Sequence, residues 1–277
     1  MDDRPVPDDW RIPEELWPEI GMHLPPAVNT HRFGGGRPRT PDRVCMDAIF
    51  FVLRTGCPWK ALDATKFCPG STAHDRFQAW VADGVFLALW KTGLLEYDCL
   101  KGIDWEWLSM DGCMTKAALG GEKDGEPPTD RAKKGVKRSL LVEAHGVPVG
   151  LAVDGANRPD MKMVEETLAS IPVERPEPRA DAKQNLCLDK GYAYDEVRET
   201  VQEFGFTAHI PPKGKEAQAV KRKARHKARR WVVERTHSWM NRFRGILIRW
   251  SKKPENYLAM LHFAPALITY RAAGLSG

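Results

Sequence analysis

Apolar side chains in the first hundred residues recur at intervals of about 3.6 residues, the period of an α-helix with one buried face. Glycine and proline interrupt these runs and mark where each helix stops. The pattern predicts four helices, over residues 14–22, 42–55, 71–84 and 85–98. We therefore expect residues 1–100 to form an all-α region.

After Gly102 the pattern changes to short apolar runs bounded by turn residues, which is typical of strands. The expected strands cover residues 107–111, 139–143, 147–153, 185–189 and 207–210. The expected helices between and after them cover residues 160–170, 194–204, 227–245 and 257–271. Strands mixed with helices in this order predict an α/β domain over residues 101–277.

The second and third predicted helices resemble a helix-turn-helix, because a glycine-bearing turn joins them and the later helix has a polar face. Ordinary packing of two helices is the alternative. Residues 34–41 before them are interpreted as a flexible linker, although their GRPR string also suits an A·T-rich minor groove. The residues that would contact DNA in these two segments are Arg37, Arg39, Thr72, His74 and Arg76.

The composition is that of a globular protein of 277 residues, with 42% apolar and 29% charged residues. No apolar run approaches the roughly 18 to 20 residues that span a bilayer, so we expect no membrane partner. The N-terminus is acidic and Pro-rich, without the basic start and apolar stretch of a signal peptide. The six cysteines show no C-x-x-C pair and no zinc-finger spacing, which favours reduced thiols in the cytoplasm.

The net charge of +5 is divided unevenly along the chain. Residues 213–253 hold 15 Lys and Arg against two acids, a net charge of +13, which leaves −8 for the rest. Residues 221–230 carry seven cations in ten positions, and these repel one another unless an anion is bound. A nucleic-acid backbone is the expected polyanion, with Lys221 and Arg222 among its contacts, because each neutralised phosphate releases counterions. The alternative is a solvated basic surface.

Two carboxylates, Asp111 and Asp189, follow short buried strands, where α/β sheets usually carry their sites. Each, taken alone, would also serve as a helix cap or a turn former. A third, Glu234, lies among cations on one stripe of a predicted helix. It either forms a local ion pair with Arg230 or Lys227, or acts as a metal ligand. Three oxygen ligands from separate elements suit Mg²⁺ or Mn²⁺.

Four segments resemble DDE transposases of bacterial insertion sequences, of the IS-five type within the IS-four-like superfamily. These segments begin MDGCMTKAALGG, GLAVDGANRPDM, NLCLDKGYAYDEV and RRWVVERTHSWMNRF. The stretch from RPRTPDRV to DRFQAW is similar to the DNA-binding region of the same family. The likeness covers residues from about 13 to 275.

The resemblance implies an RNase H-like catalytic domain, in which the two Asp and the Glu of the family match Asp111, Asp189 and Glu234. These carboxylates would bind two Mg²⁺ or Mn²⁺ ions per active site. The wider superfamily has an Arg and a Lys at fixed spacing around the Glu. Arg230 matches the Arg, whereas Asn241 stands at the position of the Lys.

The resemblance also implies DNA transposition, in which metal-dependent strand cleavage at the element ends frees 3′-hydroxyls that attack target DNA. Because two ends of double-stranded DNA must be joined, we expect a homodimer on DNA, associated with the bacterial nucleoid. An RNase H-like nuclease without transposition and a non-enzymatic DNA-binding regulator are the alternatives. Further phosphate contacts are expected from Lys116, Lys190, Arg230, Arg235 and Arg244.

Overall fold

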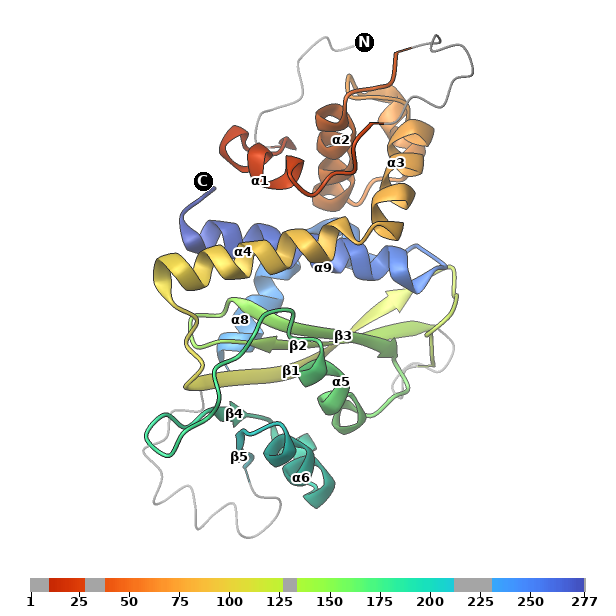
Figure 1. Ribbon diagram of the computed structural model, residues 1–277. Helices are drawn as coiled ribbons and strands as arrows, with labels where there is room; N and C mark the ends of the chain where they lie inside the picture. Colours follow the sequence, from red (N-terminus) through yellow and green to blue (C-terminus); the bar gives the residue numbers. More distant parts are fainter. Residues whose placement is uncertain (1–9, 28–37, 127–133, 212–230, 277) are drawn as a thin grey trace.

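The first part of the protein is helical, as the periodicity predicts. The computed structural model describes residues 10–27, 38–126, 134–211 and 231–276. The helices of the first part are η2 (Glu14–Leu16), α1 (Trp17–Gly21), α2 (Asp42–Thr55), η3 (Trp59–Ala64), α3 (Gly70–Ala82) and α4 (Val85–Lys101). The expectation of an all-α region is thereby confirmed (Figure 1).

A mixed sheet forms the second part. Its strands are β1 (Trp107–Ala117), β2 (Gly135–Val142), β3 (Pro148–Gly155), β4 (Asn185–Cys187), β5 (Thr207–His209) and β6 (Ile248–Arg249). The order is β3-β2-β1-β4-β5, with β6 beside the end of β1. Strands β1 to β3 are antiparallel, whereas β4 and β5 run parallel to β1. This is the RNase H-like arrangement expected above.

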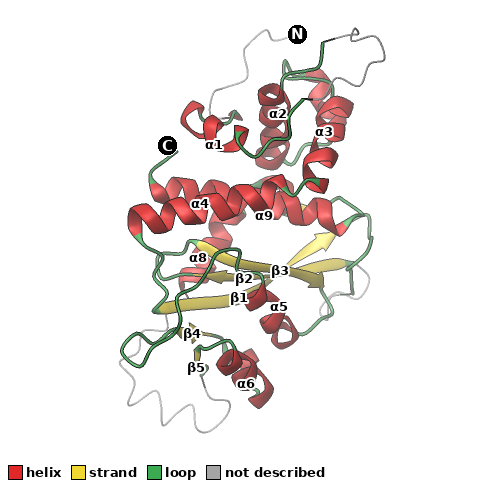
Figure 2. Cartoon of the chain, in the orientation of Figure 1, coloured by secondary structure: helices red, strands yellow, loops and turns green. Residues whose placement is uncertain are grey.

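Helices cover both faces of the sheet (Figure 2). Helices α4 and α9 lie side by side over one face, and α8 contacts β1 and β2. Helix α5 packs against β2 and β3 on the other face. Every residue of β2 is buried, as expected of a strand covered on both sides. The helices of this part are η4 (Asp160–Met163), α5 (Val164–Ala169), η5 (Lys190–Tyr192), α6 (Asp195–Glu203), α8 (Trp231–Met240), η6 (Arg244–Ile246) and α9 (Pro254–Ala273).

The first strand is longer than the sequence pattern predicts. We expected it to end at Asp111, but β1 continues to Ala117 and pairs with β2 as far as Lys116, which lies opposite Gly135. The extension escapes detection because Met114 and Lys116 are exposed, so the apolar pattern fades. Asp111 therefore lies in the middle of a strand.

The predicted helix over 227–245 ends at Met240, and its part before Trp231 lies outside the described residues. The chain turns and forms η6, which packs closely on α2. A Cβ on Gly245 would lie 2.8 Å from the carbonyl oxygen of Val52. This close approach draws the chain away from the helical path, so that Phe243 and Leu247 lie outside α8.

The likeness of α2 and α3 to a helix-turn-helix is a loose one. Residues 56–69 join the two helices and contain η3, whereas a helix-turn-helix has a turn of about three to four residues. Trp59 of η3 packs on α3, with its ring centroid 5.2 Å from that of His74 and 5.3 Å from that of Phe77. The long connection therefore belongs to the packed structure.

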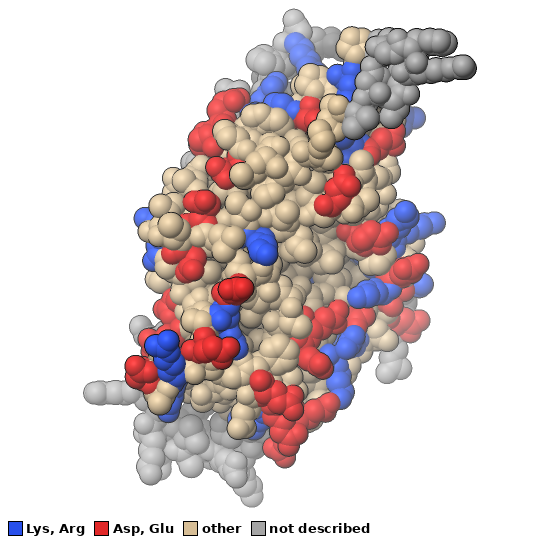
Figure 3. Space-filling view, in the orientation of Figure 1, with Lys and Arg blue, Asp and Glu red and all other residues tan. Residues whose placement is uncertain are grey.

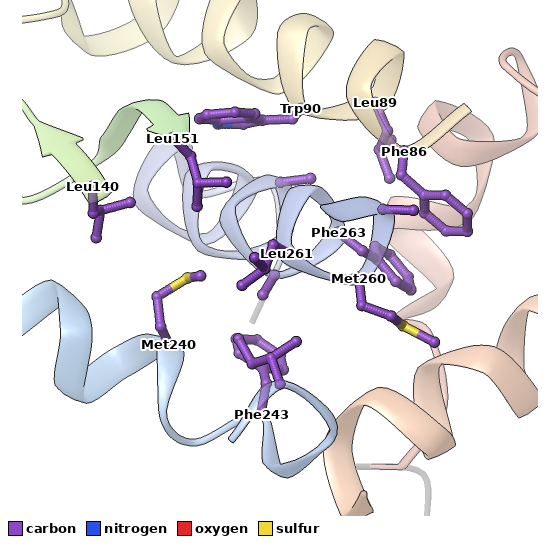
Figure 4. Packing of buried hydrophobic residues seen from close by; sticks show 14 of the residues in the cluster. Phe86, Leu89, Trp90, Leu140, Leu151, Met240, Phe243, Met260, Leu261 and Phe263 are labelled. Atoms are coloured by element: carbon purple, nitrogen blue, oxygen red, sulfur yellow. The ribbon is translucent and has the colours of Figure 1, made fainter. Parts of the chain in front are cut away.

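A hydrophobic cluster runs through both the N-terminal helices and the sheet region in the described part of the chain. Figure 4 shows Trp90 of α4 and Leu261 of α9 packed with Leu140 and Leu151 of the sheet. The indole of Trp90 also donates a hydrogen bond of 3.2 Å to the carbonyl oxygen of Pro148. The core is therefore continuous across residue 100, where we expect the boundary between the two regions.

His262 of α9 makes the core sensitive to acid. Its ring packs on Trp90, with the centroids 5.5 Å apart, and burial lowers the pKa of His262 from 6.5 to about 4. Between these values the unfolded chain binds a proton that the native protein does not, so the free energy of unfolding falls as the pH decreases from 6.5 towards 4. We expect His262→Leu to lose less stability than the wild type between pH 7 and 5, measured by urea unfolding. Equal losses in the two proteins would contradict this assignment.

Acidic and basic side chains are mixed on the surface shown in Figure 3. The most basic segment, residues 221–230, lies outside the described residues. In the part of the chain that the structure describes, no helix combines the length and apolar character needed to cross a membrane.

Candidate active site

The pairing of β1 with β4 sets Asp189 beside Asp111. The two strands are parallel, and the last pair in their register is Ser109 with Cys187. Asp111 and Asp189 each lie two residues further along, and the chain is still extended at Asp189, with φ −81° and ψ 172°. Because paired residues share a face and strands lie about 4.8 Å apart, continuing this register by two residues places Asp111 and Asp189 on the same face of neighbouring strands.

Local hydrogen bonds orient both carboxylates. Oδ1 of Asp189 accepts the N–H of Gly191 at 2.5 Å, and Oδ1 of Asp111 accepts the N–H of Gly112 at 2.9 Å. A Cβ on Gly191 would lie 2.7 Å from Oδ1 of Asp189, so glycine keeps this turn open. Asp189 therefore caps η5, as the simpler interpretation of the sequence expected, while lying beside Asp111.

Helix α8 lies on the same face of the sheet as Asp111. Leu140, the partner of Asp111 across β1 and β2, packs in the cluster that contains Met240 of α8 (Figure 4). At the hairpin between β2 and β3, Oγ1 of Thr236 donates to the carbonyl oxygen of Gly146 at 2.7 Å. The helix is therefore fixed on the sheet by apolar packing and by a main-chain contact.

His237 is the residue through which α8 contacts Asp111, because its ring lies against the Asp111 main chain. Burial lowers the pKa of His237 most, and the charge of Arg138 lowers it further. The contact with the Asp111 main chain raises it, and the resulting pKa is about 4. The imidazole is therefore neutral at pH 7. Glu234 precedes His237 by one turn on the same side of α8, and its side chain is exposed. Glu234 thus lies one turn from the residue of α8 that contacts β1.

The three predicted metal ligands are not gathered into one cluster. Among the described residues, no group of three His, Cys, Asp and Glu side chains is close enough to hold a metal ion. Asp111 comes from β1 of the sheet, Asp189 follows β4, and Glu234 comes from α8. The donor chemistry nevertheless fits, because all three are carboxylates, which are hard oxygen donors that Mg²⁺ and Mn²⁺ prefer.

Four of the predicted DNA contacts in the described residues are exposed, namely Arg39, Lys116, Lys190 and Arg244. Lys116 lies near the end of β1, and Lys190 directly follows Asp189. Arg244 lies in η6, so it does not share a helix face with Glu234 as the sequence suggested. The predicted contacts that lie outside the described residues are Arg37, Lys221, Arg222 and Arg230.

The predicted contacts around α3 are engaged with the protein itself. Arg76 pairs with Asp42, lies over the ring of Trp80 at 5.6 Å, and has a side chain that is only 12% exposed. Burial lowers the pKa of Arg76, and Arg39 also pairs with Asp42, at 2.9 Å. Thr72 and His74 are half-buried. The polar face of α3 is therefore less open than the sequence pattern suggests.

Arg235 is held by two aromatic rings of its own helix. Its guanidinium lies 4.7 Å from the ring centroids of both Trp231 and Trp239, and it donates to the carbonyl oxygen of His145. These contacts position the cation at the surface of α8.

The sequence analysis missed Arg138, a buried charge in the middle of β2. Its side chain is 1% exposed and donates to Oδ1 of Asn241 at 2.5 Å. The available signal is the KR pair inside the apolar run VKRSLLV. Because Asn241 directly follows α8, this hydrogen bond holds the end of that helix on the β1–β2 face.

Asp160 is a further charged residue close to β1. It lies on the face of the sheet opposite α8, where it pairs with Nζ of Lys137 at 3.1 Å. A Cβ on Gly112 would lie 2.2 Å from Oδ1 of Asp160. The glycine after Asp111 therefore lets this ion pair lie directly under β1.

Two family models match the chain. Residues 12–90 match the family described as "Putative transposase of IS4/5 family", and residues 107–267 match the family described as "Transposase DDE domain". The first match ends at residue 90 and the second begins at residue 107, so they lie on either side of the expected boundary.

Two proteins of one insertion element of Burkholderia cepacia are similar to the chain. The "Putative transposase for insertion sequence element IS402" is 30% identical over 162 residues, which are 54% of this chain and 70% of that protein. The "Insertion element IS402 uncharacterized 16.2 kDa protein" is 32% identical over 118 residues, 42% of this chain and 80% of that protein.

Solved structures are less similar to this chain than these two proteins are. The "Mos1 transposase paired-end complex with left transposon end" has 12% identity over 79% of this chain and 80% of that chain, with a TM-score of 0.28. The "Crystal structure of the Mos1 mariner paired end complex with Mn" has 10% identity over 88% of this chain and 87% of that one, with a TM-score of 0.27. Since the DDE-domain model alone matches more than half of the residues, this chain belongs to the DDE transposases of the IS4/5 type.

Proposed function

We propose that the protein cleaves DNA strands at the ends of its insertion sequence and joins the freed 3′-hydroxyls to target DNA. The observation that supports this most directly is the register that sets Asp111 beside Asp189 under α8. Two adjacent carboxylates on a sheet repel each other and favour a cation between them. Family membership gives the substrate class, since transposases act on DNA.

The carboxylates of Asp111, Asp189 and Glu234 would hold Mg²⁺ or Mn²⁺, two ions per site. Such ions, when bound, help to deprotonate the attacking oxygen and stabilise the leaving one. The backbone N–H groups of Gly112 and Gly191 orient the two Asp carboxylates. Glu234 would complete the set from α8, whose end Arg138 holds on the sheet.

Binding of DNA would involve both parts of the chain. Residues 1–100 are proposed to recognise the element ends, and residues 101–277 to carry out catalysis. Lys190 is exposed directly after Asp189, where it would pair with a phosphate next to the carboxylates. A homodimer is the simplest assembly that holds two ends at once.

A donor-plasmid assay tests the reaction. The purified full chain is incubated with a supercoiled plasmid that carries its own insertion element, with target DNA and Mg²⁺, and the products are separated on a gel. We expect cut ends and joined donor–target molecules, and loss of both after chelation of the metal by EDTA. Cleavage without joining would instead identify a nuclease, and a bound but intact plasmid would identify a DNA-binding regulator.

A further inference from the structure

A groove of about 760 Å³ lies where the N-terminal helices meet the ends of α8 and α9. Four arginines from separate segments line it, and we term it the arginine groove. They are Arg11 before η2, Arg54 in the last turn of α2, Arg242 after α8 and Arg271 in the last turn of α9. Figure 1 shows the end of α9 close to α1, which agrees with this convergence.

The lining of the arginine groove is positively charged. It holds four arginines, and none of the described residues that line the groove is acidic. Converging cations repel one another, and this cost is recovered when an anion binds between them.

Contacts within the protein position two of these arginines, Arg11 and Arg54. Arg11 approaches Asp47 at 4.0 Å, but Arg43 pairs with the same carboxylate at 3.3 Å. The guanidinium of Arg54 lies 5.8 Å from the ring centroid of Phe243. Arg54 also lies in the last turn of its helix, where a cation offsets the helix dipole. Asp47, the acid in these contacts, is not among the residues that line the groove.

The chemistry of the lining fits a sugar–phosphate backbone. Apolar side chains form much of the wall, including Phe50, Phe243 and Leu267. Deoxyribose offers apolar surface to such a wall, while guanidinium groups bind phosphates through two parallel hydrogen bonds. A row of phosphates would place one anion near each of several arginines, which a single small anion would not.

The arginine groove adjoins the helix of the candidate active site. Trp239 of α8 lines the groove, and Arg235 stacks on the same indole at 4.7 Å. Arg235 directly follows Glu234 in sequence. Arg11 and Arg54 come from the N-terminal region, so a ligand in the groove contacts both parts of the chain.

We propose that the arginine groove binds the phosphates of double-stranded DNA and holds the duplex jointly by the N-terminal region and by α8. This inference rests on the proposed function, and it assigns four arginines that are not among the DNA contacts expected from the sequence.

Salt dependence of DNA binding tests the assignment. The full chain is titrated with a fluorescein-labelled 30-bp duplex in about 50–200 mM KCl, and the slope of log K against log salt concentration is measured. Each phosphate contact contributes about 0.9 to that slope, so Arg54→Gln and Arg242→Gln should each reduce it by about 0.9, and together by about 1.8. Arg242→Lys keeps the charge and should keep the slope.

The control is Arg198→Gln, which removes the same charge from an exposed position on α6 and should bind as the wild type does. Circular dichroism verifies folding, and exposed Arg242 provides a test even if the half-buried Arg54 does not tolerate replacement. Wild-type slopes in folded Arg242→Gln and Arg54→Gln would overturn the groove assignment and leave the proposed function intact. A wild-type chain that fails to bind duplex DNA would overturn both. Unchanged DNA binding with a loss of dimer in ultracentrifugation would assign the groove to a second copy of the chain instead.

Discussion

An Asp189→Asn protein will bind DNA as the wild type does and will not cleave it. Asparagine keeps the size of the side chain, and its oxygen still accepts the N–H of Gly191, so the turn after β4 is preserved. What is lost is the negative charge that a divalent cation requires of its ligand. A metal ion supplies several kcal/mol of transition-state stabilisation, which corresponds to about 10³-fold or more in rate. Asp111→Asn should behave in the same way.

The rate is measured as conversion of the supercoiled donor plasmid to cut forms, and binding is measured by fluorescence anisotropy. Asp181→Asn, an exposed aspartate in the loop before β4, is the matched control and should cleave at the wild-type rate. Glu234→Gln tests the third acid separately, because it removes a negative charge from an exposed side chain on α8 and leaves both aspartates in place. An Asp189→Asn protein that cleaved normally would refute the proposed site.

A Gly121→Ala protein will be less stable than the wild type by about 3 kcal/mol or more, through backbone strain and steric overlap together. Gly121 has φ +131°, and a Cβ there would lie 2.2 Å from the carbonyl oxygen of Lys252. The same carbonyl accepts a 2.6 Å hydrogen bond from Arg249, whose side chain is fully buried. Movement of Lys252 to relieve the overlap would therefore weaken the hydrogen bonding of a buried guanidinium, which is costly.

Thermal unfolding measures the effect, and a shift of about 2–4 °C per kcal/mol predicts a midpoint lowered by roughly 6–12 °C. Gly84→Ala is the matched control, because Gly84 has the left-handed φ of +70° and no atom within 4 Å of the added Cβ. It should lose about 1–2 kcal/mol, from backbone conformation alone. Equal losses of stability in Gly121→Ala and Gly84→Ala would show that steric overlap with the carbonyl oxygen of Lys252 does not destabilise the protein.

The elements that could be predicted well are those whose limits are set locally. The helix expected over 42–55 matches α2, because a proline precedes it and Gly56, with φ +70°, ends it. The limits of β1 and α8 were wrong, because distant partners set them. Pairing with β2 extends β1 to Ala117, and the approach of Gly245 to α2 ends the helical path after Met240.

The candidate site also has features that a local sequence pattern predicts and features that it does not. Asp111 and Asp189 could be selected from the sequence because each follows an apolar run. Their adjacency depends on the register between β1 and β4, which no local pattern encodes. The engagement of Arg76 by Asp42 likewise joins positions on two different helices.

The stack of Arg235 on two tryptophans is a different case, because its signal is present in the sequence. Trp231 and Trp239 lie four residues before and after Arg235, the spacing at which helical neighbours meet. This contact could have been predicted once a helix was expected there.

Helix α4 closes the N-terminal region in sequence, yet in space it lies beside α9 over the sheet. The two helices are closely fitted, since a Cβ on Gly93 would lie 2.9 Å from the ring of Tyr270. The first hundred residues are therefore not an interchangeable module. A chimaera that takes them from a relative, in order to redirect the protein to other element ends, needs the matching α9 as well.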